Sequence, residues 1–150
     1  MLRSAGGTWV RVLAVLGLAI SGLAVTAPAS YAGTSCSYPY CSETYNQTSL
    51  PVYVAHNWCG DKEWLIQSAP PCGAKSSDYW LAAGQHTDSH QDWDTFRVDA
   101  YWCYKFQRYS VIWGWESVET VDRRNQSAPE WVRVHNDETA YIIKQSSSSC

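Results

Sequence analysis

Residues 1–32 have the pattern of a secretory signal peptide, and this pattern constrains the fold of everything that follows. Arg3 and Arg11 supply positive charge, and residues 12–25 form an uncharged, mostly apolar stretch that is short for a transmembrane helix. Small residues around Ala32 suit a signal peptidase. We therefore expect a secreted, extracellular chain whose thiols meet an oxidising compartment.

The mature chain is expected to start near residue 33, which leaves 118 of the 150 residues, enough for one domain with a single core. All six cysteines lie in this part, so three disulfides are predicted, although sequence alone leaves every pairing open. Structural zinc is disfavoured because no Cys-x-x-Cys pair occurs. Proximity and the turn residues favour three pairs: Cys36 with Cys41, Cys59 with Cys72, and Cys103 with Cys150.

The charge balance argues against a nucleic-acid partner. Without Arg3 and Arg11, the 11 Lys and Arg residues fall to nine against 14 Asp and Glu residues, so the mature net charge is −5. No basic stripe is present, and the nearest candidate, Arg123 with Arg124, stands in a turn-like sequence. We expect neither a nucleic-acid partner nor a membrane partner.

Secondary structure is predicted to be almost entirely β. Short runs rich in Val, Ile, Tyr and Trp recur with turn residues between them, which is typical of a sandwich or barrel. In residues 95–100, Phe96, Val98 and Ala100 alternate with polar side chains, as in a strand with one buried face. The sequence thus predicts a compact, single-domain all-β sandwich or barrel over residues 51–150, stapled by disulfides. The expected strands are 52–56, 63–67, 79–82, 95–101, 102–106, 109–113, 118–121, 131–135 and 140–144.

Residues 33–50 differ from the rest and are expected to form an extended N-terminal arm. They hold one charged side chain, Glu43, among Ser, Thr, Tyr, Asn and Gln. Two interpretations stay open: a passive tail, or a docking arm stiffened by the small ring between Cys36 and Cys41. A free arm predicts that deleting residues 33–45 leaves thermal melting nearly unchanged. The partner-binding residues expected in a docking arm are Tyr38, Pro39, Tyr40 and Tyr45.

Catalytic chemistry is not predicted. His86 and His90 stand four residues apart, with Asp92 and Asp94 close behind, so a metal site is conceivable. The stretch lacks helical periodicity, however, and a solvated loop is the favoured interpretation. Hydrolase motifs and phosphate-binding glycine loops are absent from the sequence. We expect no enzyme, no catalytic residue, no metal and no cofactor.

Two classes of binding function remain. Exposed aromatic rings can stack on sugars, and a carbohydrate-binding or cell-wall-binding platform can be drawn from aromatic residues between positions 101 and 115, although alternate members of such runs are simply core in any sheet. Protein docking is the second class, because Trp and Tyr are preferred at hot spots; protease inhibition is a subset of it. The residues of the possible platform are Tyr101, Trp102, Tyr104, Trp113 and Trp115.

Four segments give the chain a resemblance to a known group. They are VAHNWCG at 54–60, QDWDTFRVDAYWCY at 91–104, VDRR at 121–124 and QSSSSC at 145–150. In these the mature chain resembles the small secreted adaptor subunits of bacterial umbrella toxin particles. The resemblance implies a part that joins a repeat-containing toxin stalk to a trypsin-like lectin subunit in an antibacterial assembly. It implies no binding residue beyond the arm.

Overall fold

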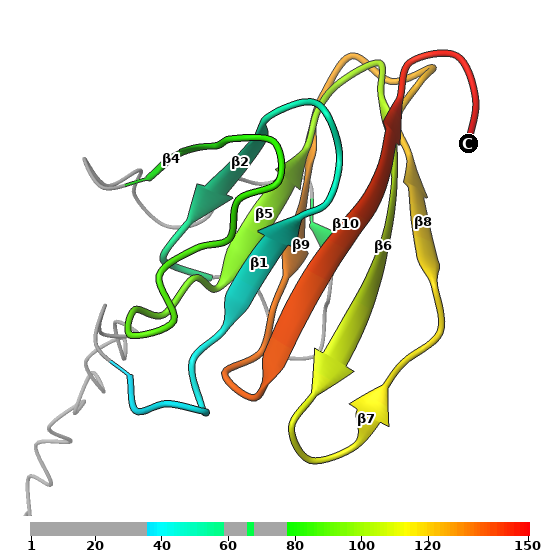
Figure 1. Cartoon of the computed structure of the whole chain (residues 1–150). Coiled ribbons are helices and arrows are strands. Elements are labelled where there is room, and N and C mark those ends of the chain that lie inside the picture. The colour runs from blue at the N-terminus through cyan, green and yellow to red at the C-terminus, as the bar shows by residue number, and fades with distance from the viewer. Residues whose placement is uncertain (1–35, 59–65, 68–77) are drawn as a thin grey trace, which may run out of the picture.

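The fold is a β-sandwich of two five-stranded sheets (Figure 1). The computed structural model describes residues 36–58, 66–67 and 78–150, and these residues contain no helix, and hence none that is long and apolar enough to cross a membrane. The all-β prediction is confirmed. The first sheet is built from β1 (Glu43–Asn46), β10 (Glu138–Ser146), β6 (Cys103–Ser110), β7 (Gly114–Trp115) and β8 (Glu119–Asp122). The second is built from β3 (Ile66–Gln67), β9 (Glu130–Arg133), β5 (Thr95–Val98), β2 (Val52–Ala55) and β4 (Tyr79–Leu81).

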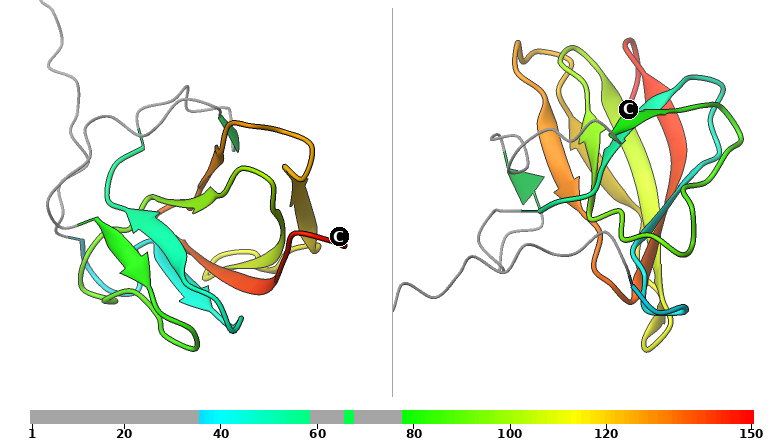
Figure 2. Two further views of the ribbon diagram at one scale, coloured as in Figure 1. Left: turned by 90° about the horizontal axis from the view of Figure 1, so that it is seen from above. Right: turned by 90° about the vertical axis from the view of Figure 1, so that its left-hand side faces the viewer.

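The core lies between the two sheets, which face each other in Figure 2. Strand β6 alternates buried and half-buried residues from Tyr104 onward, so every second side chain points inward. Phe106 on β6 meets Phe96 on β5 edge to face, with ring centroids 5.0 Å apart, and this pair joins the sheets. The buried apolar cluster is Val52, Val54, Leu81, Trp93, Phe96, Val98, Tyr104, Phe106, Val121, Val132, Val134, Ala140 and Ile142.

Most expected strands are found within one to four residues of their predicted ends. The segments 102–106 and 109–113 were predicted as two strands, but they form the single strand β6 and the turn that follows it. Strands β1 and β7 were not predicted. Of the expected strand 63–67, only the last two residues lie within the described part of the chain, where they form β3.

The expected arm is wrong for its second half, because residues 43–46 are strand β1 in the first sheet. β1 pairs in parallel with β10, from Glu43 opposite Thr139 to Asn46 opposite Ile142. The Asn46 side-chain amide donates to the carbonyls of Leu81 and Ala82 at 3.2 and 3.1 Å. Polar composition suggested exposure, but the Asn46 amide is buried and has hydrogen-bond partners.

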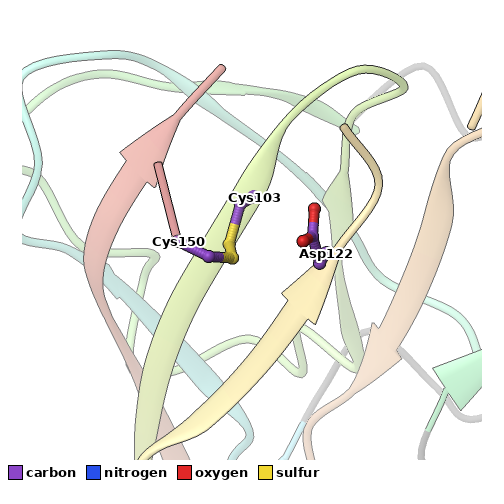
Figure 3. Close-up of side chains that lie close together, drawn as sticks. All are labelled: Cys103, Asp122 and Cys150. Carbon is purple, nitrogen blue, oxygen red and sulfur yellow. A yellow bond between two sulfur atoms is a disulfide. The ribbon is translucent and has the colours of Figure 1, made fainter. Parts of the chain in front are cut away.

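Two of the three predicted disulfides are confirmed. Cys36 pairs with Cys41 and Cys103 pairs with Cys150, with Cα atoms 5.3 and 5.5 Å apart. The second bond ties the C-terminus to the start of β6 (Figure 3). The third predicted pair, Cys59 with Cys72, lies outside the described residues.

Candidate functional site

The turn between β6 and β7 exposes a group of large apolar side chains at one end of the sandwich (Figure 1). Trp113 leaves 81% of its surface in solvent, and Ile112 leaves 59%. Large exposed apolar side chains that gather in one short segment mark interaction sites on protein surfaces. We call this surface the apolar tip; its members are Val111, Ile112, Trp113, Trp115 and Val118.

The turn that carries the apolar tip is held in one shape by its own polar groups. The Ser110 hydroxyl oxygen accepts hydrogen bonds from the backbone N–H groups of Ile112 and Trp113, at 3.1 and 3.2 Å. The same hydroxyl donates to the Asp137 carboxylate at 2.7 Å. Gly114 has φ +80°, a left-handed conformation that favours glycine. The tip is therefore preorganised, and a partner need not order it on binding.

Behind the apolar tip lies a buried arginine surrounded by carboxylates. Arg108 points inward from β6, and its Nη1 atom lies 3.1 Å from Glu119 and 3.7 Å from Glu116. Its Nε atom lies 3.8 Å from a Glu138 oxygen, but Nε and Nη2 make no hydrogen bond. Burial raises the pKa of Glu119, and the arginine opposes that shift. The Glu116 N–H also donates to the Arg108 carbonyl at 3.0 Å, so this cluster anchors the base of the tip.

The ring closed by Cys36 and Cys41 exposes two of the four residues that were predicted to bind a partner. Tyr38 is 72% exposed and Tyr40 is 56% exposed. Pro39 stands between them and is also exposed; the peptide bond before it is cis. The ring lies at the same end of the sandwich as the apolar tip (Figures 1 and 2). Two aromatic surfaces thus share one end of the molecule.

Tyr45, the fourth predicted partner-binding residue, lies elsewhere. It is half-buried on β1, where its ring stacks between His86 and Tyr141 at centroid distances of 5.4 and 5.7 Å. Between the ring and β1, the Ser42 N–H and hydroxyl donate to the Asp92 carboxylate at 3.1 and 2.6 Å. These bonds fix the point at which the disulfide ring leaves the sandwich.

The predicted solvated loop is wrong at Asp92 and Asp94, which are buried. Asp94 accepts a hydrogen bond from the Trp58 N–H at 3.1 Å. Its burial, together with the nearby charge of Asp92, raises its pKa to about 7. His90 is exposed and His86 turns its Nδ1 atom to a backbone carbonyl, so among the described residues these four side chains do not form a ligand set.

Within the described ranges, the one group with metal-ligand spacing is formed by Cys103, Asp122 and Cys150, whose ligand atoms lie within 4.8 Å of one another (Figure 3). The two sulfur atoms are bonded to each other, so neither is a thiolate that could bind a metal. Asp122 is held by Arg124 at 2.6 Å, and these hydrogen bonds lower its pKa to about 2. The group is a covalent staple beside a surface ion pair.

The aromatic residues predicted as a sugar platform do not share one face. Tyr104 is buried, and its hydroxyl donates to Asp99 at 3.1 Å. Trp102 is half-buried against the core, and Tyr101 is exposed in the β5–β6 loop at the end opposite the tip (Figure 1). Trp113 and Trp115 are exposed near the β6–β7 turn, and the Trp115 ring packs against Tyr109 and Tyr141.

Val111 and Ile112 of the apolar tip were missed because residues 109–113 were predicted as a strand, and Val118 was missed because residues 118–121 were predicted as another. The available signal was Gly114, a turn residue within an apolar run, which marks a chain reversal there instead of a continuous strand. A rigid turn that presents indole and aliphatic groups suits insertion into a pocket of a partner protein. No family model matches the chain, and neither the curated proteins nor the solved structures include a match.

Proposed function

We propose that this chain is a secreted, non-enzymatic adaptor that joins protein subunits of an extracellular antibacterial toxin assembly. The observation that carries the proposal is the apolar tip, on which Trp113 is 81% exposed. Burying a tryptophan of this kind in a partner is among the largest single contributions to protein–protein affinity. The resemblance to adaptor subunits of umbrella toxin particles supports the same role.

The charges around the tip favour a protein partner over a membrane. Glu116 and Glu119 are partly exposed beside it, and Asp137 lies at the base of the turn. Anionic lipid surfaces repel such a rim, whereas a protein pocket with basic residues at its edge attracts it. The proposed partner therefore has an apolar pocket bordered by Lys or Arg.

An adaptor needs a second contact, and the disulfide ring offers one. Tyr38 and Tyr40 project from a covalently closed loop of six residues, so little conformational entropy is lost when they bind. The proposed pair of partners is the repeat-containing stalk and the trypsin-like lectin subunit. The ring and the tip lie at one end, which suits a junction where both partners meet.

Co-purification from the producing organism tests the proposal. Tagged wild-type protein purified from culture medium should carry stalk and lectin subunits, identified by mass spectrometry. Trp113→Ala should reduce the recovery of one partner by at least about tenfold, which corresponds to a loss near 1.4 kcal/mol. Tyr101→Ala is the matched control, because it removes another exposed aromatic ring, 58% exposed, at the opposite end.

Two results would contradict the adaptor function. One is wild-type protein that purifies from the culture medium without stoichiometric companions. The other is unchanged recovery of every companion with two variants, Trp113→Ala and the double variant Tyr38→Ala with Tyr40→Ala, when circular dichroism shows that both are folded.

A further inference from the structure

Four side chains form a row across the outer face of the second sheet, on the side opposite the core. Strand pairing places Tyr53 opposite both Trp80 and Arg97, and Arg97 opposite Trp131. The row therefore crosses β4, β2, β5 and β9 in turn, and neighbouring members are cross-strand pairs. We call this row the Arg97 row.

The guanidinium of Arg97 is framed by the three aromatic rings. Its central carbon lies 4.8 Å from the Tyr53 ring centroid, 4.9 Å from that of Trp80 and 5.8 Å from that of Trp131. Tyr53 meets both tryptophans edge to face, at 5.4 and 5.9 Å. Cation–π contacts with several rings hold the planar group in one orientation.

One edge of this guanidinium is occupied and the other is free. Nε donates to the Asp99 carboxylate at 2.7 Å, and the other oxygen of Asp99 accepts from the Tyr104 hydroxyl at 3.1 Å. Within the described residues, the terminal nitrogens Nη1 and Nη2 make no hydrogen bond or ion pair. The Arg97 side chain is 24% exposed, so solvent and ligands reach this edge.

The free edge of Arg97 and the exposed indole of Trp80 together favour one class of ligand. The two terminal nitrogens of a guanidinium match the two oxygens of a carboxylate. Trp80 is in contact with the same guanidinium and is 48% exposed, so the part of its ring that Arg97 leaves uncovered is an apolar surface on which a sugar ring can pack. The negative charge of Asp99 disfavours a doubly charged phosphate more than a singly charged carboxylate.

We infer that the Arg97 row binds an acidic sugar, whose carboxylate pairs with the free edge of Arg97 while its ring packs on Trp80. The ligand class is a hexuronic acid, alone or as a unit of an acidic polysaccharide. The inference does not depend on the proposed adaptor function, because the row shares no residue with the apolar tip or the disulfide ring. It assigns carbohydrate binding to a different surface from the sequence-predicted platform.

A nuclear magnetic resonance titration of the full mature protein tests the inference with sodium glucuronate as the probe. The Arg97 Nε–H and Trp80 indole N–H signals should shift in a saturable manner. Glucose tests the need for the carboxylate, and acetate tests the need for the ring. Each control should bind at least about tenfold more weakly than glucuronate.

Variants separate the contributions of the two groups. Arg97→Lys keeps the charge but loses the planar fork, so glucuronate binding should weaken at least about tenfold. Arg124→Lys is the matched control, since Arg124 is paired with Asp122 on the surface outside the row, and should bind as wild type does. Trp80→Ala truncates an exposed side chain and should also weaken binding, which keeps the test usable if Arg97→Lys does not fold.

Three outcomes would overturn the inference. The first is no saturable shift of either signal with glucuronate. The second is equal binding of glucose or acetate, which would mean that the carboxylate or the ring is not recognised. The third is glucuronate binding that survives both Arg97→Lys and Trp80→Ala.

Discussion

Replacing Arg108 with methionine should destabilise the fold and should do so more at neutral than at acidic pH. The arginine side chain is 2% exposed and faces three carboxylates, of which Glu138 is 9% exposed and Glu119 is 29% exposed. Removing one partner of a buried ion pair typically costs about 3–5 kcal/mol, because the remaining charge is left uncompensated. Water reaches two of the three carboxylates, so we expect the lower end, about 3 kcal/mol.

The pH dependence follows from the carboxylates that remain. Burial already raises the pKa of Glu119, while Arg108 lowers it, so the variant raises it further. An acid whose pKa is raised in the folded state stabilises the fold below its ordinary pKa and loses that contribution as the pH rises through the raised value. The difference between wild type and Arg108→Met should therefore be small at pH 4 and largest at pH 7.

Thermal unfolding followed by circular dichroism at both pH values measures the effect. For a domain of this size, about 3 kcal/mol corresponds to a fall in Tm of roughly 10–15 °C at pH 7. The matched control is Arg124→Met, whose ion pair with Asp122 is exposed and screened by water, so its loss should leave Tm nearly unchanged. A loss below about 1 kcal/mol at pH 7 for Arg108→Met, or an equal loss at pH 4, would refute this reasoning.

Four further predictions concern the buried polar network, the disulfide at the C-terminus and β1. Because the pKa of Asp94 is raised to about 7, the free energy of unfolding of the wild type should fall as the pH rises from about 4 to 8. Asp94→Asn should remove up to about 4 kcal/mol of this fall, as measured by urea denaturation across that pH range. Parallel pH profiles for wild type and variant would disprove the prediction. Replacing Cys103 and Cys150 with serine opens a loop of separation 47 and should cost about 4 kcal/mol on the chain-entropy model, measured by guanidinium unfolding. Ser42→Ala should cost about 2 kcal/mol through its lost hydrogen bond to a buried carboxylate, and deleting residues 33–45 should lower Tm strongly; an unchanged Tm would restore the free-arm interpretation.

The fold class could be predicted because alternation and turn chemistry are local signals. Residues 95–98 alternate and form β5 as expected, and the two described disulfides are pairs that proximity and turn residues favoured among the possible pairings. Strand β1 could not be predicted in the same way. Its inward residues, Thr44 and Asn46, are polar, and their burial depends on distant segments: the Thr44 backbone N–H donates to Thr87, and the Asn46 amide donates to the Leu81 carbonyl. Partners far apart in the sequence leave no periodic pattern.

The candidate surfaces were predicted only in part for a related reason. Tyr38 and Tyr40 are exposed because a ring of six residues has no interior in which to hide them. The Arg97 row depends on strand order: Trp80 and Trp131 are 51 positions apart and meet through β2 and β5. Composition reveals many aromatic residues, but sheet topology decides which of them share a face.

Arg108 and Arg97 carry the same charge but have different roles, one in the interior and one at the surface. Arg108 and Arg97 come from neighbouring elements of opposite sheets, yet the first is buried inside among carboxylates and the second lies outside among rings. The inner arginine pairs with acidic groups at the base of the apolar tip, and its carbonyl accepts a hydrogen bond from the Glu116 N–H there. Arg97, the outer arginine, donates only from Nε to the Asp99 carboxylate, and its free edge remains available. Because the two arginines act through separate contacts, loss of one should leave the binding surface built on the other intact.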